Sequence, residues 1–99
     1  MAEVRILPRA DLDLEEAITW LRSRSLQAAR RFEDTVEQAI DRIAAIPEMY
    51  ALVDEQHRLC PVRKSQYVIV YRYDSPSDEV IVVAVVDARR DPRSWASGF

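Results

Sequence analysis

The sequence predicts an α+β fold in which an antiparallel helix hairpin packs on one face of a small, mainly antiparallel sheet. Apolar residues recur at helical spacing twice in the first half of the chain, and three short runs rich in β-branched and aromatic residues follow in the second half. The 99 residues contain no linker, repeat or low-complexity segment. The predicted order is therefore β-α-α-β-β-β, in a single domain over residues 1–99.

The first two elements are a short strand and an amphipathic helix. The strand begins at Val4 and is stopped by Pro8. The apolar face of the helix that follows is marked by Ala10, Leu14, Ala17, Ile18 and Leu21. Its early residues include Asp11, Asp13, Glu15 and Glu16. Because the N-terminal end of the helix dipole favours anions, these carboxylates support the start of the helix.

A second helix follows after a very short link. Ser25 is the predicted N-cap, and Pro47 ends the helix. Its apolar face is marked by Ala28, Ala29, Phe32, Val36, Ala39, Ile40 and Ile43. Two helices joined so closely are expected to form an antiparallel hairpin.

Three strands are predicted in the second half, over residues 58–62, 67–73 and 79–86. The segments between them, RKSQ and DSPSD, carry residues typical of turns, so the strands form an antiparallel meander. The last strand is apolar at every position from Val80 to Val86, which indicates that both its faces are covered and that it is central. Pro61 favours an edge position for the first strand of the three.

Composition excludes several kinds of site. The only glycine is Gly98, so a glycine-rich phosphate loop is excluded. His57 and Cys60 lie three residues apart on an extended segment and point to opposite faces, so no metal site is predicted. Cys60 is expected in the core and His57 in a solvated polar loop. No signal peptide or membrane span is seen, and a cytoplasmic protein without a cofactor is expected.

The basic residues are unevenly distributed in a chain whose formal net charge is −3. Four of them lie between residues 58 and 73, a stretch without Asp or Glu, and three more follow the last strand. In a meander, Arg63 and Lys64 should share one end of the sheet with the residues that follow Val86. Arg58 and Arg72 should lie nearer the other end.

Clusters of arginine suit phosphate or carboxylate ligands, because the planar guanidinium binds two oxygens at once. The alternative is structural. Arg89 and Arg90 would then pair with Asp87, Asp91 or helix carboxylates, and Trp95 would cover an exposed edge.

Several segments of the sequence together carry a family resemblance. They are DLEEAITWL (residues 13–21), SLQAARRF (25–32), YVIVYRY (67–73) and above all VAVVDARRDPRSW (83–95). In this order they resemble the RelE/ParE superfamily of type II toxin–antitoxin toxins, over nearly the whole chain. The resemblance implies a cognate antitoxin that wraps the toxin, with operator DNA bound only through the antitoxin.

Two activities are implied by the resemblance. ParE-like members poison DNA gyrase by protein contact, and this kind of toxin is associated with plasmid stabilisation. RelE-like members are ribosome-dependent endoribonucleases that cut mRNA. In a nuclease, the catalytic residues would be drawn from Arg89, Arg90, Asp87, Tyr71 and Lys64.

The ParE-like branch is favoured by departures from the nuclease pattern. Val68 stands where RelE-like nucleases carry an arginine, three positions before the tyrosine of the third strand. Asp87 replaces a histidine often found where the last strand ends, and it would repel a scissile phosphate unless an arginine offset it. Tyr67 and Tyr71 are expected to be packed against the helices. The sequence therefore favours growth arrest through gyrase, with a ribosome-dependent endoribonuclease or an inactive antitoxin-binding relative as alternatives.

Site residues are expected on this basis. The target-binding set is Arg63, Lys64, Arg89, Arg90, Arg93 and Trp95. The antitoxin-binding set is Trp20, Arg58 and Arg72. Trp20 falls off the apolar face of its helix, and the alternative for it is packing under the inter-helix loop. The acidic helices and an apolar groove beside the hairpin would suit an antitoxin rich in Lys and Arg.

Overall fold

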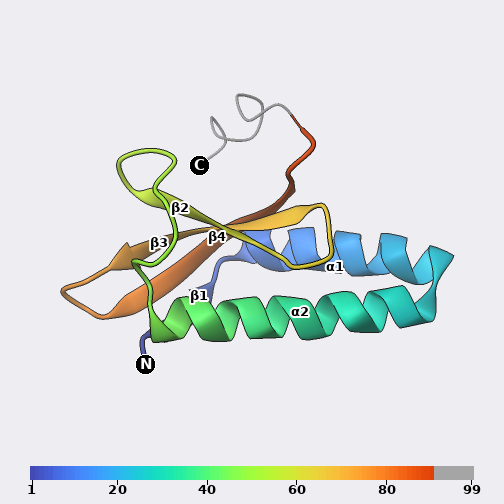
Figure 1. The fold of residues 1–99 in the computed structure, drawn as a ribbon, viewed down its shortest axis with the longest axis horizontal. Helices are drawn as coiled ribbons and strands as arrows, with labels where there is room; N and C mark the ends of the chain where they lie inside the picture. The colour runs from blue at the N-terminus through green and yellow to red at the C-terminus, as the bar shows by residue number, and fades with distance from the viewer. Residues whose placement is uncertain (91–99) are drawn as a thin grey trace.

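The computed structural model describes residues 1–90 and confirms the predicted order of elements (Figure 1). The helices are α1 (Pro8–Arg24) and α2 (Leu26–Ala45). The strands are β1 (Glu3–Ile6), β2 (His57–Pro61), β3 (Tyr67–Asp74) and β4 (Glu79–Asp87). Pro8, which ends the first strand, also occupies the first turn of α1, where its missing N–H costs nothing.

The four strands form one sheet in the order β1-β4-β3-β2. As predicted, β2, β3 and β4 are an antiparallel meander, and Pro61 lies on the edge strand β2. The short β1 adds to the far side of β4 in parallel, with Val4 opposite Val80 and Ile6 opposite Val82. The prediction that β4 is central is therefore confirmed, and Val80 to Val86 are all buried.

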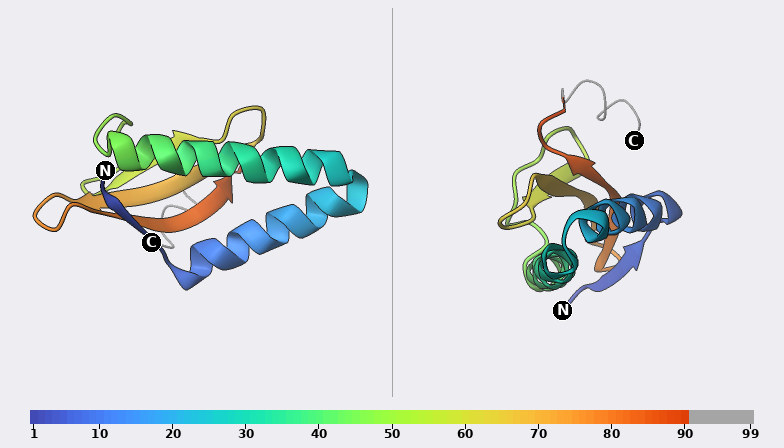
Figure 2. Two further views of the ribbon diagram at one scale, coloured as in Figure 1. Left: turned by 90° about the horizontal axis from the view of Figure 1, so that it is seen from below. Right: turned by 90° about the vertical axis from the view of Figure 1, so that its right-hand side faces the viewer.

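The two helices form an antiparallel hairpin on one face of the sheet (Figure 2). Ser25 alone separates them. Its backbone N–H donates to the carbonyl of Leu21, and its Oγ accepts from the N–H of Ala28 at 3.1 Å, so one residue closes α1 and caps α2. The predicted N-cap is therefore confirmed. Ile46 is the C-cap of α2, and Pro47 follows it.

The core has two parts, one on each face of the sheet. Between the sheet and the helices lie Phe32, Val36, Ile43, Cys60, Ile69, Tyr71, Val80 and Val82, among others. A smaller cluster lies on the other face of the sheet, and it contains Val68, Val70, Ile81, Val83, Ala84 and Val86. Cys60 is fully buried, as expected. Neither described helix is long and apolar enough to cross a membrane.

The expectation of a solvated His57 is wrong. His57 begins β2 and is only 8% exposed. The Asp54 carboxylate accepts hydrogen bonds from the backbone N–H groups of Gln56 and His57, and it lies 2.9 Å from His57 Nδ1. The Asp54 carboxylate thus accepts hydrogen bonds from the backbone of its own turn, and it also supplies the polar partner that the buried imidazole of His57 needs.

Candidate functional site

The end of the sheet where β4 stops gathers most of the predicted target-binding residues. Tyr67 on β3 pairs with Asp87 on β4, and the N–H of Ala88 donates to the carbonyl of Gln66 at 2.7 Å. The β2–β3 turn and the residues after Asp87 therefore lie at the same end, as the meander predicts. This end of the sheet is called the Asp87 end below.

A cleft of about 460 Å³ lies between α1 and the Asp87 end. Its walls carry charges of both signs and two aromatic rings. The main lining residues are Arg9, Asp13, Glu16, Trp20, Tyr67, Asp87, Arg89 and Arg90. We call it the α1 cleft. A cleft with this mixture suits a charged protein surface better than an apolar small molecule.

Asp87 and Arg89 form a two-pronged ion pair at the mouth of the α1 cleft. Arg89 Nη2 lies 2.7 Å from Asp87 Oδ2 and its Nε lies 3.1 Å from Oδ1, while the Arg89 backbone N–H also donates to Oδ1 at 2.9 Å. The hydrogen bond from the guanidinium is the main cause that lowers the pKa of Asp87, and the same contact raises the pKa of Arg89. Asp87 is therefore a weak base, and the guanidinium of Arg89 is already occupied.

Arg90 differs from its neighbour. Its backbone N–H donates to the carbonyl of Asp87 at 3.1 Å, which fixes the turn after β4. Its exposed side chain has no carboxylate within 4.0 Å among residues 1–90, and it lines the α1 cleft. Within the described residues, Arg90, unlike Arg89, can bind a partner's anion without first losing an ion pair.

The two tyrosines of β3 have different environments. Tyr67 is half-buried, lines the α1 cleft, and contacts the Phe32 ring at a centroid distance of 5.3 Å. Burial, and next the Asp87 charge, raise its pKa. Tyr71 is fully buried and donates its hydroxyl to the Pro47 carbonyl at 2.7 Å, and burial raises its pKa to about 12. The prediction of packing against the helices is confirmed for both, and Tyr71 is not at the surface where a substrate could reach it.

Arg63 and Lys64 share the Asp87 end but do not line the α1 cleft. They border a second, smaller cleft of about 90 Å³ between the β2–β3 turn and the helix hairpin, together with Arg31 of α2. Lys64 has a φ of 59°, in the left-handed region. For a residue with a Cβ this conformation costs about 1 kcal/mol or more, and such residues are concentrated at functional sites. Sequence reasoning missed Arg31, although it stands beside the core residue Phe32 in AARRF.

Arg58 and Arg72 lie at the opposite end of the sheet, as predicted, since they pair with Tyr71 and His57. Arg58 donates to the carbonyls of Tyr50 at 2.6 Å and Glu48 at 3.1 Å, so it holds the loop before β2. Arg72 lines a separate cleft of about 560 Å³. The predicted antitoxin-binding residues are thus not brought together, because Trp20 borders the α1 cleft at the other end.

Trp20 is at the surface of α1. The residue is 44% exposed, and the guanidinium carbon of Arg24 lies 4.5 Å from the centroid of its ring. The alternative of packing under the inter-helix loop is therefore wrong. An exposed tryptophan beside a cleft is a typical anchor for a protein partner, and this contact stays a prediction.

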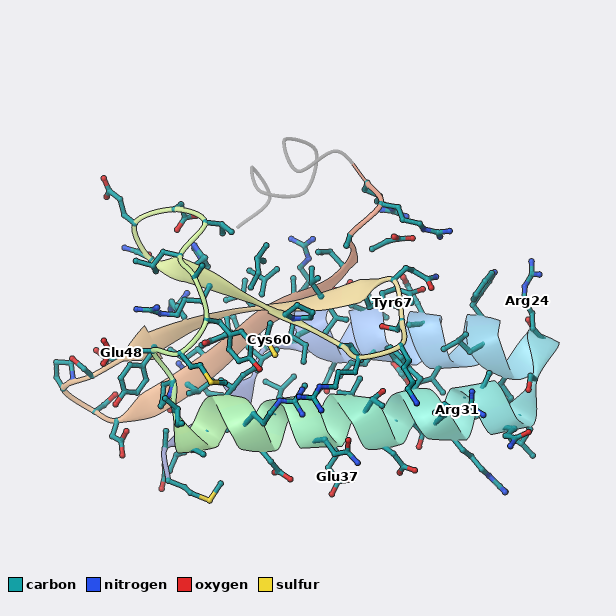
Figure 3. All side chains as sticks on the ribbon, viewed as in Figure 1. Arg24, Arg31, Glu37, Glu48, Cys60 and Tyr67 are labelled. Atoms are coloured by element: carbon teal, nitrogen blue, oxygen red, sulfur yellow. The ribbon has the colours of Figure 1, made fainter. Side chains whose placement is uncertain are left out.

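A groove runs along the outer side of the helix hairpin, and we call it the hairpin groove. Its floor is formed by Leu14, Ile18, Val36 and Ile40, and its rim by Glu33, Glu37 and Asp41, around a volume of about 230 Å³. Figure 3 shows Glu37 pointing away from the sheet. The apolar groove with acidic surroundings that the sequence predicts is therefore present.

The remaining predicted residues, Arg93 and Trp95, lie outside the described residues. Within residues 1–90, no group of three His, Cys, Asp or Glu side chains is arranged to hold a metal ion. Asp13, another carboxylate that lines the α1 cleft, accepts a hydrogen bond from the Val85 backbone N–H at 2.9 Å. The arrangement at the Asp87 end therefore offers cations and aromatic rings for binding, and the carboxylates of Asp13 and Asp87 are committed to internal contacts, whereas Glu16 on the same cleft is exposed.

Comparison with known proteins agrees with the fold and the motifs. The model of the ParE toxin of the type II toxin–antitoxin system parDE matches residues 4–92. Among solved structures, the isolated E. coli RelE toxin in its P21 crystal form superposes with a TM-score of 0.65 at 18% identity, over 99% of this chain and 96% of that one. At that identity the likeness concerns the fold alone. No curated protein sequence matches significantly. The chain belongs to the ParE toxin family of type II toxin–antitoxin systems, within the RelE/ParE superfamily.

Proposed function

We propose that this protein arrests growth by binding and poisoning DNA gyrase, and that a cognate antitoxin neutralises it. The observation that carries the proposal is the Asp87–Arg89 ion pair. A ribonuclease needs a group that removes a proton from a 2′-hydroxyl, and efficient general bases have a pKa near the working pH. Asp87 has a lowered pKa and Tyr67 and Tyr71 have raised ones, so none of the three is poised for that step.

The Asp87 end is the proposed contact surface for gyrase. The α1 cleft is lined by the ring of Tyr67 and by Arg90, whose side chain has no carboxylate partner among residues 1–90. Aromatic and arginine side chains contribute most of the energy in many protein interfaces. Arg63 and Lys64 extend the basic part of this surface, and Arg93 and Trp95 remain part of the proposed target-binding set. A single domain of this kind acts in the cytoplasm, where gyrase is found.

The antitoxin is proposed to bind along the helix hairpin, with Trp20 of α1 among its contacts. The hairpin groove combines an apolar floor with the carboxylates of Glu33, Glu37 and Asp41. An amphipathic antitoxin segment with apolar side chains on one face and Lys or Arg at its edges is complementary to both features. Contact with operator DNA would then come from the antitoxin.

The proposal is tested by a supercoiling assay with purified gyrase and rising amounts of this protein, alone and premixed with its antitoxin. Inhibition that the antitoxin reverses is expected. A parallel arm measures cleavage of mRNA on purified ribosomes. The fold shared with the RelE toxin keeps the nuclease as the second candidate. Ribosome-dependent cleavage without any effect on gyrase would establish that candidate, and no effect in either arm would indicate an inactive antitoxin-binding relative.

A further inference from the structure

Three cations converge on the small cleft between the β2–β3 turn and the helices. Arg31 reaches it from α2, and Arg63 and Lys64 come from the turn. All three residues are exposed, and none has a carboxylate within 4.0 Å among the residues that the structure describes. We call the space between them the Arg31 cleft.

Of the ten other described arginines, five have a carboxylate partner, whereas Arg30, Arg72 and Arg90, like these three cations, have neither a carboxylate nor another side-chain partner within the described residues. The described arginines with a carboxylate partner are Arg5, Arg9, Arg22, Arg58 and Arg89. Arg24 instead lies over the Trp20 ring, and Arg42 donates to the Tyr50 hydroxyl. In a chain with more carboxylates than cations, three unpaired cations around one cleft mark a place that favours an external anion.

The turn holds its two cations in a defined position. The Ser65 hydroxyl donates to the Val62 carbonyl at 2.9 Å and accepts from the N–H of Tyr67 at 3.1 Å. Lys64 keeps a left-handed backbone conformation that glycine or asparagine would adopt more easily. A lysine at such a position in a well-bonded turn is consistent with a requirement for its charge.

The size of the cleft limits the ligand. The volume of about 90 Å³ is sufficient for a single small ionic group. A carboxylate presents two oxygens in one plane, which suits a single arginine fork. A phosphate presents oxygens in several directions and can face three cations that approach from different elements.

We propose that the Arg31 cleft binds one phosphodiester group of a nucleic acid strand. The choice of nucleic acid over a phosphorylated or acidic protein rests on the proposed function, since DNA gyrase is an enzyme that acts on DNA.

The test uses the full chain labelled with ¹⁵N and a short oligothymidylate as the probe, with inorganic phosphate and a polyglutamate peptide in parallel titrations. The oligonucleotide should shift the amide signals of residues 63–66 and the guanidinium signals of Arg31 and Arg63. The logarithm of the association constant should fall with the logarithm of salt concentration with a slope of about −0.7, which corresponds to one phosphate contact on a single strand.

Three variants and one control locate the site. Arg31→Gln, Arg63→Gln and Lys64→Gly should each weaken oligonucleotide binding about fivefold to tenfold, the range expected for one charge-assisted contact. Lys64→Gly keeps the left-handed turn and removes its steric cost. Weaker oligonucleotide binding by this variant therefore reports the missing charge rather than misfolding. Arg30→Gln removes a neighbouring exposed arginine that does not line the cleft, and it should bind like wild type.

Several results would overturn the proposal: polyglutamate binding as tightly as the oligonucleotide, phosphate binding without oligonucleotide binding, no binding by any probe, or an equal loss in Arg30→Gln. Because these titrations contain no gyrase, their outcome is independent of the supercoiling assay. A chain that inhibits gyrase but fails here refutes only the Arg31 cleft, and a chain that binds here but leaves gyrase unaffected refutes only the proposed target.

Discussion

The Asp13 carboxylate on α1 accepts a hydrogen bond from the backbone N–H of Val85 on β4, at 2.9 Å. β1 ends at Ile6, opposite Val82, so the rest of β4 has no strand beside it on that edge within the described residues. Asp13 supplies the acceptor that a strand neighbour would have supplied, and Arg9 Nε lies 3.8 Å from the same carboxylate oxygen. One side chain thus completes the edge of the sheet and forms part of the wall of the α1 cleft.

Asp13→Ala is expected to destabilise the protein. It leaves the N–H of Val85, a buried residue, without a partner, which costs about 1–3 kcal/mol of unfolding free energy. Glu15→Ala removes an exposed carboxylate from the same helix and should change stability by less than about 0.5 kcal/mol. Urea unfolding of both variants measures the difference. Equal losses would show that the Asp13–Val85 contact does not stabilise the edge.

Asp87 should titrate below its ordinary pKa of 3.8, because Arg89 binds its charged form. A lowered pKa in the folded state means that the stabilisation is present above the unfolded pKa and is lost as the pH falls through the folded value. Arg89→Gln should bring the Asp87 midpoint back toward 3.8 and reduce the acid sensitivity of folding. Carboxyl chemical shifts followed by NMR give both midpoints. A midpoint that Arg89→Gln leaves unchanged would contradict the pairing.

Tyr71 should ionise only at about pH 12, because its side chain is buried. Its raised pKa stabilises the fold below the unfolded value near 10, and this stabilisation is lost as the pH rises through the folded value. Difference absorbance between wild type and Tyr71→Phe isolates its ionisation during an alkaline titration. The variant should also lose about 1 kcal/mol of stability, because the Pro47 carbonyl loses its donor. Ionisation near pH 10 in the folded protein would refute the buried environment.

Arg90→Ala should abolish growth arrest without unfolding the protein. The side chain lies exposed on the α1 cleft, and the turn contact made by its backbone N–H is kept in the variant. Induced expression with a growth readout, together with circular dichroism of the purified variant, checks both parts. Arg30→Ala is the matched control and should remain toxic. Undiminished arrest by Arg90→Ala, or loss of its fold, would contradict the assignment.

Trp20→Ala should weaken binding of the cognate antitoxin by at least about tenfold if the exposed ring is an interface anchor. Its stability should change little, because the residue is 44% exposed and its ring is covered by the Arg24 guanidinium. Calorimetry with the purified antitoxin measures the affinity, with Leu12→Ala as a second exposed apolar residue of α1 for comparison. Wild-type affinity in Trp20→Ala would remove this residue from the antitoxin surface.

Local patterns in the sequence predict much of the fold. Helical spacing predicts α1 and α2, the Ser25 hydroxyl predicts the cap between them, and the uninterrupted apolar run from Val80 to Val86 predicts a central strand. The pairing of β1 with β4 is a contact between distant segments, and four residues carry too little pattern to specify a neighbour. His57 is buried through a turn whose signal, Asp54 three residues earlier, was present in the sequence.

The site is less accessible to such reasoning, for a physical reason. The meander correctly places Arg63, Lys64, Arg89 and Arg90 at one end of the sheet. It does not reveal that Arg89 is paired within two residues while Arg90 has no carboxylate partner among residues 1–90. The sequence pattern also does not predict that Arg31 lies near the β2–β3 turn, because that arrangement depends on how the helix hairpin packs on the sheet.

The most direct test of the central claim is to measure DNA cleavage by gyrase in the presence of this protein. Gyrase and plasmid DNA are incubated with the protein, the enzyme is denatured, and linear DNA is quantified. The account predicts linear DNA that increases with the amount of protein and disappears when the antitoxin is added first. No linear DNA at any ratio, with mRNA cleaved on ribosomes by the same preparation, would contradict it.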